Sequence, residues 1–260
     1  MDIVLKMETG MADYAHRAAV TGSTYLATTA EYDLYCHYVA GLVGEGLSRL
    51  FSASGKESPS IGTQLELSNS MGLLLQKTNI IRDFREDVDQ QRFFWPHEIW
   101  GRKEFGFVEM REMTATDPET VKKAMWAQTA MILDALRHTI DALDYLRMLK
   151  NQSVFVFCAI PAAMAMATLE LCFMNPAMFQ RNIKIRKAEA AQVSPFYFGC
   201  DWVVLIGLLF QLIMRSMNPR EVGLIFREYA RKIHAKAAPA DPSFIRISVA
   251  CGKVNTFFFQ

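Results

Sequence analysis

The sequence predicts an all-α protein folded as one unit. Apolar residues recur at helical spacing in nearly every long segment, and the alternation typical of strands is almost absent. The 260 residues are 51% hydrophobic, with 28 basic against 27 acidic side chains, a composition typical of a folded globular chain. No internal repeat or low-complexity linker divides the chain. The net charge of +1 leaves no basic surplus to neutralise phosphates, so we expect no nucleic-acid partner.

The first half of the chain contains three predicted helical segments. The first is alanine-rich and runs from Tyr14 to Thr28. In the second, Tyr32–Ser54, apolar or small residues repeat at helical spacing and mark one face. Gly55 then stands where a helix commonly ends. The third runs from about Leu65 to Asp89 and ends before the turn at Phe93–Pro96.

The second half continues the helical pattern. Asp117-Pro118-Glu119 is typical of a helix start, because it has proline in the first turn and acid near the positive end of the helix dipole. The periodic pattern then extends from Thr120 to about Leu149. Further helices are predicted at Ser153–Cys172, Asn182–Ala191 and Arg220–Ala238.

The strongest candidate site is a polar stripe on the helix predicted at 65–89. Asn79, Asp83 and Asp87 are spaced to stack on one helix face, with Gln76 a turn earlier and Glu86 beside them. Like charges at this spacing repel, so the helix gains nothing structurally from them. A hard cation would remove the conflict, since Mg²⁺ prefers carboxylate oxygens and often bridges them to substrate phosphates.

Three arginines accompany this stripe. Arg82, Arg85 and Arg92 could grip the same phosphate oxygens with their planar guanidinium groups. The alternative is a solvated acidic face balanced by Arg82 and Arg85. The apolar neighbours Ile80 and Ile81 are harder to reconcile with a surface helix.

A second pattern, Tyr35–Leu47, contains Gly41, Gly44 and Gly46 in helical register. Each glycine costs a helix roughly 1 kcal/mol relative to alanine. Either a close helix contact or a channel for a long apolar ligand would need their missing side chains, and the residues leave both readings open. Tyr35 on the same face could donate or accept a proton, although a lone tyrosine also fits a core position.

A third pattern, Asn151–Pro161, places a proline inside a helical segment. Proline kinks a helix and frees backbone carbonyls, and the aromatic rings here could stabilise a cation. A kinked core helix is the simpler alternative. Lys184, Arg186 and Lys187 form a small basic cluster that suits phosphate or is merely solvated.

Together these segments closely resemble squalene synthases (farnesyl-diphosphate farnesyltransferases) of fungal type, within the squalene/phytoene synthase family. The resemblance is carried, in order, by YCHYVAGLVGEGLSRL at Tyr35–Leu50, QKTNIIRDFRED at Gln76–Asp87, FFWPHEI at Phe93–Ile99 and NQSVFVFCAIP at Asn151–Pro161. It runs from about Ile3 to Gln192 and resumes from Leu212 to Lys253.

The resemblance implies an isoprenoid-synthase-type helical bundle and a head-to-head prenyl transfer. Two molecules of farnesyl diphosphate would condense to presqualene diphosphate, with Mg²⁺ assisting loss of the first diphosphate. A second ionisation, rearrangement and hydride transfer from NADPH would then give squalene. We expect a monomer.

The resemblance also assigns roles by motif position. It implies Mg²⁺ ligands at Asp83, Glu86 and Asp87. It implies diphosphate-binding side chains at Gln76, Asn79, Arg82 and Arg92. It implies NADPH-binding side chains at Asn79, Lys184 and Arg186. Tyr35 would serve in proton removal, and Phe157 would line and stabilise the cationic second half-reaction.

The chain also departs from the family pattern. The family carries another acidic motif on helices upstream of Met1, so we expect an incomplete bundle that lacks its N-terminal helices. The family's C-terminal membrane anchor is not in this sequence. We therefore expect weak or no activity from the chain as written.

The resemblance implies a location on the cytosolic face of the endoplasmic reticulum membrane. As written, the chain would be soluble and cytoplasmic. The alternative function is an inactive or duplicate copy, for example one serving resistance to a squalene synthase inhibitor.

One apolar segment interrupts the family pattern. Residues 193–211 divide the catalytic region into 1–192 and 212–253, and removing them joins two family-like helical halves. The densest apolar run, Trp202–Met214, has about 13 residues and falls short of the roughly 20 needed to cross a bilayer. An intron begins and ends with characteristic nucleotides, which a codon for Val193 and a codon for Gln211 can supply at the two ends of this segment. The tail 254–260 has the same form. We interpret both as translated introns; the competing hypothesis is a membrane-associating insertion.

Overall fold

The computed structural model is an all-helical bundle, as the sequence predicts. It describes residues 2–22, 24–185 and 218–257. The N-terminal part contains α1 (Asp2–Thr21), β1 (Thr24–Tyr25), α2 (Thr29–Cys36), the π-helix η1 (His37–Gly41), α3 (Leu42–Ala53), η2 (Pro59–Thr63), α4 (Leu65–Arg82), α5 (Phe84–Asp89), β2 (Arg92–Phe93) and α6 (His97–Trp100). The remainder contains η3 (Met110–Thr114), α7 (Pro118–Leu136), α8 (Thr139–Met148), α9 (Gln152–Cys172), η4 (Pro176–Phe179), α12 (Pro219–Lys236) and α13 (Phe244–Thr256).

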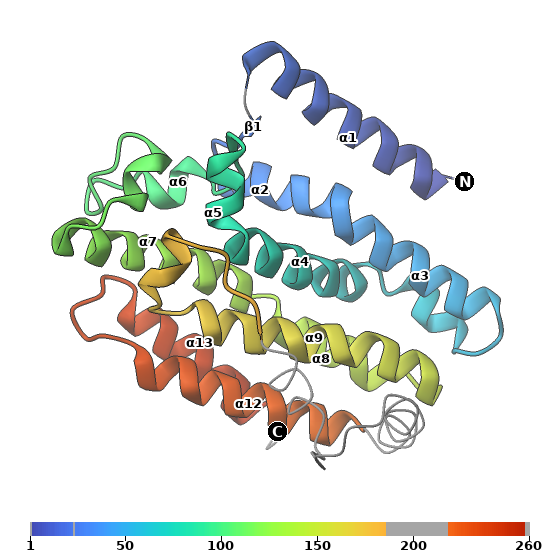
Figure 1. The fold of residues 1–260 in the computed structure, drawn as a ribbon. Helices are drawn as coiled ribbons and strands as arrows, with labels where there is room; N and C mark the ends of the chain where they lie inside the picture. Colours follow the sequence, from blue (N-terminus) through green and yellow to red (C-terminus); the bar gives the residue numbers. More distant parts are fainter. Residues whose placement is uncertain (1, 23, 186–217, 258–260) are drawn as a thin grey trace, which may run out of the picture.

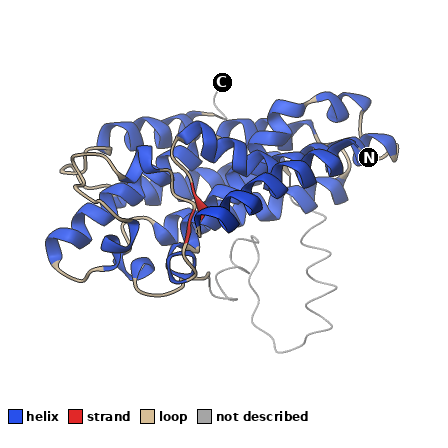
Figure 2. Cartoon of the chain, turned by 90° about the horizontal axis from the view of Figure 1, so that it is seen from above, coloured by secondary structure: helices blue, strands red, loops and turns tan. Residues whose placement is uncertain are grey.

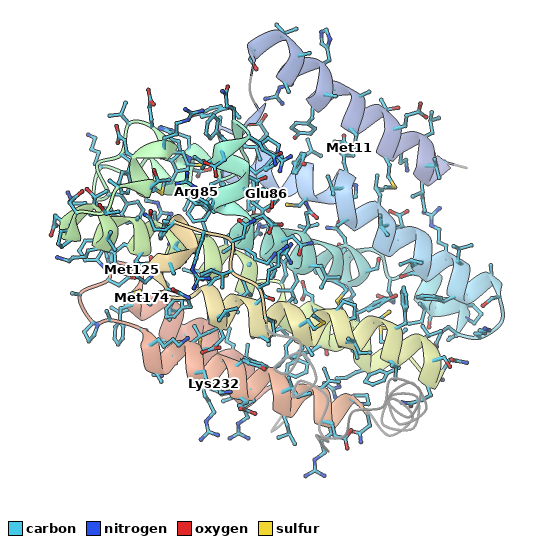
Figure 3. The ribbon with its side chains drawn as sticks, viewed as in Figure 1. Met11, Arg85, Glu86, Met125, Met174 and Lys232 are labelled. Atoms are coloured by element: carbon cyan, nitrogen blue, oxygen red, sulfur yellow. The ribbon has the colours of Figure 1, made fainter. Side chains whose placement is uncertain are left out.

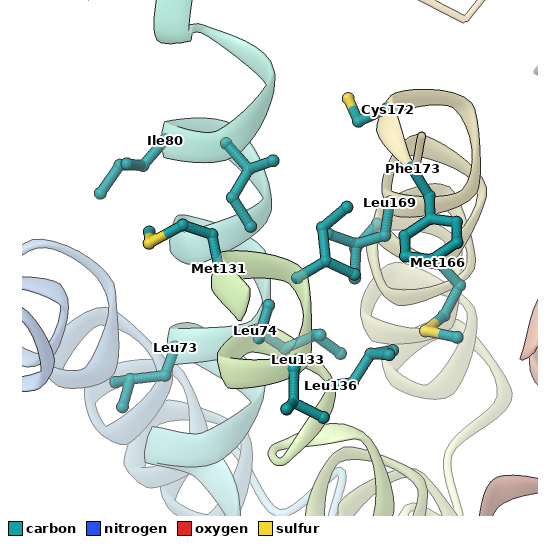
Figure 4. Close-up of a cluster of buried hydrophobic side chains, with 14 of the residues drawn as sticks. Leu73, Leu74, Ile80, Met131, Leu133, Leu136, Met166, Leu169, Cys172 and Phe173 are labelled. Carbon is teal, nitrogen blue, oxygen red and sulfur yellow. The ribbon is translucent and has the colours of Figure 1, made fainter. Parts of the chain in front are cut away.

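The helix α4 is the centre of the bundle. It packs against η1, α3, α7, α8 and α9, while α1 lies at one edge and α12 and α13 lie at the opposite edge (Figure 1). Buried side chains occur all round α4, which is typical of a helix enclosed by others rather than lying on a surface. Figure 4 shows the resulting core, in which Leu73 and Leu74 of α4 meet side chains of α7 and α9 such as Met131 and Leu169.

Local sequence signals explain where the longer helices begin. The Asp117 side chain accepts a hydrogen bond from the Thr120 N–H, with Pro118 in the first turn, so the predicted start of α7 is confirmed. The Asn151 side chain accepts from the N–H groups of Ser153 and Val154 at the start of α9. A reciprocal capping box between Asn218 and Glu221 begins α12.

Two predicted helices in the first half have different ends in the structure. The helix expected to reach Thr28 ends at Thr21, because Gly22 has φ of +76° and the chain turns into an extended segment. There β1 pairs in parallel with β2, and the two short strands lie among the helices (Figure 2). The helix expected at 65–89 breaks at Asp83 into α4 and α5.

Two predictions in the second half also need correction. The expected continuous helix Thr120–Leu149 is divided between α7 and α8 at Arg137 and His138. Residues 182–185 are not helical, so the helix expected to begin at Asn182 was wrong there. Apolar periodicity continues across a short break of this kind, which is why it does not reveal the break.

The apolar segment 193–211 and Arg186 lie outside the described residues. Of the predicted tail 254–260, residues 254–256 belong to α13, and Val254 is buried. Among the described helices, α9 is long and apolar enough to cross a membrane by composition alone, and 61% of its most apolar window is buried inside the bundle. A core helix passes the same test.

Candidate active site

The acidic stripe is continuous across the break between α4 and α5. Asp83 has φ −89° and ψ 11° and joins the two helices. The N–H of Asp83 still donates to the Asn79 carbonyl at 2.9 Å, and the N–H of Asp87 donates to the Asp83 carbonyl at 2.9 Å. Asn79, Asp83 and Asp87 therefore follow one another a turn apart, as the sequence predicts.

Arginines neutralise two of the three predicted metal-binding carboxylates. Arg82 donates from Nε and Nη2 to the two oxygens of Asp83, at 2.8 and 2.7 Å. Arg92 donates from Nε and Nη2 to Oδ1 of Asp87, at 3.0 and 2.7 Å. These guanidinium groups are half-buried beside the carboxylates. A guanidinium group can donate in the same forked way to a carboxylate or to a phosphate.

The neighbouring Arg85 and Glu86 have partners of their own. Both side chains are marked on α5 in Figure 3. Arg85 pairs with Asp89 on the same helix, at 2.6 Å. Glu86 accepts a hydrogen bond at 3.0 Å from Nδ2 of Asn182, which lies far along the chain. The segment after η4 is thereby held against the acidic stripe.

The electrostatics of Asp87 favour a cation. Burial, the largest cause, together with the charges of Asp83 and Glu86, raises the pKa of Asp87 to about 6 against the opposing hydrogen bond and charge of Arg92. A buried carboxylate with acidic neighbours is the kind of group that a divalent cation stabilises. Residues Asp83, Glu86 and Asp87 thus fit Mg²⁺ by donor chemistry. Among the described residues, however, no group of three or more Asp, Glu, His or Cys side chains converges closely enough to enclose a metal alone.

Tyr35 lies beside this cluster. Its ring stacks on Phe94 with centroids 5.0 Å apart and meets Tyr14 edge-on at 5.1 Å. Burial raises the pKa of Tyr35 to about 12, and the charges of Asp87 and Arg92 also act on it. The predicted proton-handling residue and the predicted metal-binding helix are thus close enough to interact electrostatically.

Phe157 lies on an apolar cavity of about 290 Å³ between α3, α4 and α9. Its ring is 57% exposed and meets Phe51 of α3 edge-on, with centroids 6.2 Å apart. The lining is almost wholly apolar and includes Leu75, next to Gln76 on α4, and Pro161 on α9. The cavity therefore extends along the helix that carries the acidic stripe.

Two glycines of the second pattern, Gly41 and Gly44, serve a close helix contact, whereas a Cβ on Gly46 would meet only the Ile3 side chain at 3.7 Å. A Cβ on Gly44 would lie 2.5 Å from the Ser68 carbonyl oxygen, and one on Gly41 would overlap the Asn69 side chain. Gly72 on α4 is equally tight, because its Cβ would lie 2.5 Å from the Ala40 carbonyl oxygen. Gly44 and Gly72 also line the Phe157 cavity, so the close helix contact and the cavity share one crossing, and a channel for an apolar ligand there stays a prediction.

The predicted NADPH-binding residues are only partly described. Lys184 is exposed on an extended segment after Ile183, whose side chain is buried. Arg186 lies outside the described residues. Gln76 is half-buried on α4, and Asn79 is exposed a turn later. The structure thus places Asn79 on the acidic stripe and leaves the proposed nucleotide site untested.

The sequence reasoning missed a buried charge network behind the stripe. Lys77 is fully buried, and its Nζ lies 2.5 Å from Oδ1 of Asp33 on α2 and 2.5 Å from Oδ2 of Asp134 on α7. Arg137 binds the same two carboxylates. The network ties the Tyr35 helix to the acidic helix. A lysine amid apolar positions of α4 is the signal that could have revealed it.

Comparison with known proteins agrees with this fold. Residues 1–189 match the squalene/phytoene synthase family. The chain therefore belongs to that family, and the predicted resemblance and all-α fold are confirmed.

Within the family, the chain is similar to fungal squalene synthases. It is 58% identical to the squalene synthase of Ganoderma lucidum, over 98% of this chain and 52% of that protein. It is 47% identical to the squalene synthase of Mycosarcoma maydis, over 98% of this chain and 43% of that protein. A solved complex of TcSQS with a ligand aligns with a TM-score of 0.83 and 33% identity, over 99% of this chain and 67% of that one. The chain thus spans about half the length of these fungal relatives.

Proposed function

We propose that the protein carrying this chain condenses two farnesyl diphosphates head-to-head to presqualene diphosphate and reduces that intermediate to squalene with NADPH. The proposal rests on three features that lie near one another. They are an acidic stripe paired with arginines, a buried tyrosine beside it, and an apolar cavity along the same helix. Similarity to named squalene synthases supports this reaction over other prenyl transfers.

The acidic stripe would hold the diphosphate through Mg²⁺. Asp83 and Asp87, with Glu86 beside them, are the residues proposed to bind the ion, which would neutralise charge on the leaving diphosphate. Arg82 and Arg92 would move from their carboxylates to phosphate oxygens as the metal takes the carboxylates over. Their forked donors suit either partner.

Tyr35 would handle the proton released when the cyclopropane closes. A phenol with a pKa of about 12 keeps its proton at neutral pH. It would therefore receive the substrate proton on Oη only while passing its own proton to another oxygen, such as one of the diphosphate. Burial against Tyr14 and Phe94 fixes the ring in place for this exchange.

The Phe157 cavity would hold the prenyl chain. Its apolar lining excludes water from a reacting carbocation. The faces of Phe51 and Phe157 carry negative quadrupole charge that attracts a cation. We place the second half-reaction here, with NADPH phosphate near Lys184, and we infer the cytosolic face of the endoplasmic reticulum membrane as its location.

Product analysis tests the reaction directly. Protein is incubated with farnesyl diphosphate, Mg²⁺ and NADPH, and presqualene diphosphate and squalene are quantified. Asp83→Asn and Asp87→Asn are each expected to lower product formation at least about a hundredfold, because each removes a carboxylate proposed to hold the Mg²⁺ that would neutralise the departing diphosphate. Asp89→Asn is the matched control, since Asp89 is exposed and pairs with Arg85, and it is expected to leave the rate unchanged.

Two other outcomes would overturn the proposal. Full activity in both Asp83→Asn and Asp87→Asn would remove the acidic stripe from the mechanism. If the unsubstituted protein bound farnesyl diphosphate but formed neither product, the non-catalytic copy would be the better account.

A further inference from the structure

A second cavity lies away from the proposed active site, between α7 and α13. It has a volume of about 630 Å³, and its lining also includes Ile99 of α6 and Arg102 just after that helix. It shares no lining residue with the Phe157 cavity. Its volume falls in the range of about 300–1,000 Å³ that is typical of small-molecule sites.

The floor of this cavity is aliphatic. Ile99, Leu133 and Leu136 are buried there and form a continuous apolar surface between α6 and α7. On α13, Ile245 is 76% exposed and Val249 is 54% exposed, one turn apart on the wall of the same cavity. Solvent therefore reaches an apolar trough with room for a hydrocarbon chain.

The rim of the cavity is basic. Arg102, Arg137, Arg246 and Lys253 line it, against the single carboxylate of Asp134. That carboxylate is already bound by Lys77 and Arg137. Within the described ranges, Arg246 and Lys253 on α13 have no carboxylate within ion-pair distance. Two cations thus remain available beside an apolar trough.

We propose that this cavity binds a single-chain amphiphilic anion, an alkyl or prenyl phosphate. The chain would lie on Leu133, Leu136 and Val249, and the phosphate would lie between Arg246 and Lys253. Phosphate oxygens accept strong charge-assisted hydrogen bonds from both side chains. Burial of the chain adds affinity in proportion to the apolar area removed from water. The site is independent of the prenyl transfer proposed above.

Dodecyl phosphate, below its micelle concentration and with EDTA present, is the probe for calorimetric titration. We expect saturable binding of dodecyl phosphate and none of inorganic phosphate, because the trough supplies much of the affinity. Arg246→Gln/Lys253→Gln is expected to weaken binding at least about tenfold through loss of two charge-assisted contacts. The control Arg220→Gln/Arg231→Gln removes the same charge from exposed positions on α12 and is expected to leave binding unchanged.

Paired bulky substitutions locate the ligand. Val249→Trp fills this trough from a half-exposed position and is expected to weaken binding about tenfold or more. Val43→Trp, at a similarly exposed position on the Phe157 cavity, is expected to leave it unchanged. The reverse pattern would overturn the proposal, as would equal weakening by the α12 control. Binding to anionic vesicles that requires Arg246 and Lys253, without binding of dodecyl phosphate, would assign the face to a bilayer surface instead.

Discussion

Lys77 is a buried cation on α4 that pairs with carboxylates on α2 and α7 and so links three helices. Its Nζ lies 2.5 Å from carboxylates on α2 and α7 and 4.9 Å from the centroid of the Tyr32 ring. Removing one partner of a buried ion pair costs more than the pair contributes, because it leaves uncompensated charge in the core. Arg137 remains on both carboxylates in such a variant and limits the loss.

We therefore expect Lys77→Met to lower the free energy of unfolding by about 3 kcal/mol, measured by urea denaturation at pH 7. Lys6→Met is the control, because the Lys6–Asp2 pair is exposed on α1 and its removal is expected to leave the free energy of unfolding almost unchanged. Equal effects of the two substitutions would show that the buried network does not stabilise the fold.

His138 makes the stability of the fold depend on pH in the acid range. Burial, the largest cause, together with the positive charges of Lys77 and Arg137, lowers the pKa of His138 to about 3. Its Nε2 is buried without a hydrogen-bond partner. Between an unfolded pKa near 6.5 and the folded value of about 3, the unfolded chain binds the extra proton, so stability falls as pH falls through this window.

Replacing His138 should remove this part of the acid sensitivity. We expect His138→Asn to unfold with nearly unchanged free energy at pH 7, where His138 is neutral in both states. At pH 5 the variant is expected to be more stable than the parent by about 2 kcal/mol. Urea denaturation at both pH values checks this, and a pH-independent difference between the two proteins would contradict it.

At the scale of elements, the crossing of η1 and α3 over α4 positions the site. Gly44 and Gly72 let these backbones approach closely, and the same crossing forms one wall of the Phe157 cavity. The π-helix η1 begins at His37, two residues after Tyr35, and π-turns inside helices often occur at functional sites. Helix spacing and site geometry are therefore coupled here.

Gly72→Ala tests that coupling. A Cβ at residue 72 would lie 2.5 Å from the Ala40 carbonyl oxygen, so the helices must separate, and we expect a loss of about 1–3 kcal/mol in unfolding free energy. Gly252→Ala on α13 meets nothing within 4 Å and is expected to gain up to about 1 kcal/mol. Thermal unfolding of both variants distinguishes them, and comparable melting temperatures would refute the close-contact account.

The sequence predicted the helices that carry both an apolar face and a cap, as at Asp117 for α7. It did not predict the break at Asp83, because the break preserves the four-residue hydrogen bonds on each side. The strands β1 and β2 have two residues each, too few for alternation to appear. Short elements held by distant partners leave no periodic signal.

The distance in sequence between contacting residues also explains which site residues were predicted and which were missed. Asp83 and Asp87 are linked by spacing within one segment and could be recognised from sequence. Lys77 reaches Asp33 and Asp134 across 44 and 57 residues, and Asn182 reaches Glu86 across 96. Contacts of that separation are set by how the bundle closes and not by a local pattern.

At the scale of the whole molecule, residues on both sides of 186–217 form one core. Val222, Phe226 and Ile233 of α12 are buried in the same cluster as α7 and α9. Lys236 of α12 also binds Glu170 of α9, with Nζ to Oε1 at 2.6 Å. The buried face of α12 and the Lys236–Glu170 ion pair therefore attach this helix to the bundle.

Deleting residues 193–211 should leave a folded protein. If the segment is a translated intron, the deletion joins two halves of a family-like chain, and we expect cooperative thermal unfolding at a temperature equal to or above that of the parent. Deleting Pro219–Lys236 instead removes the buried face of α12 and is expected to abolish cooperative unfolding. Sequencing the transcript gives an independent check, because a spliced message is expected to lack the codons for 193–211. A mature transcript that retains them, together with a deletion variant that fails to fold, would identify the segment as a genuine part of the protein and favour the membrane-associating insertion.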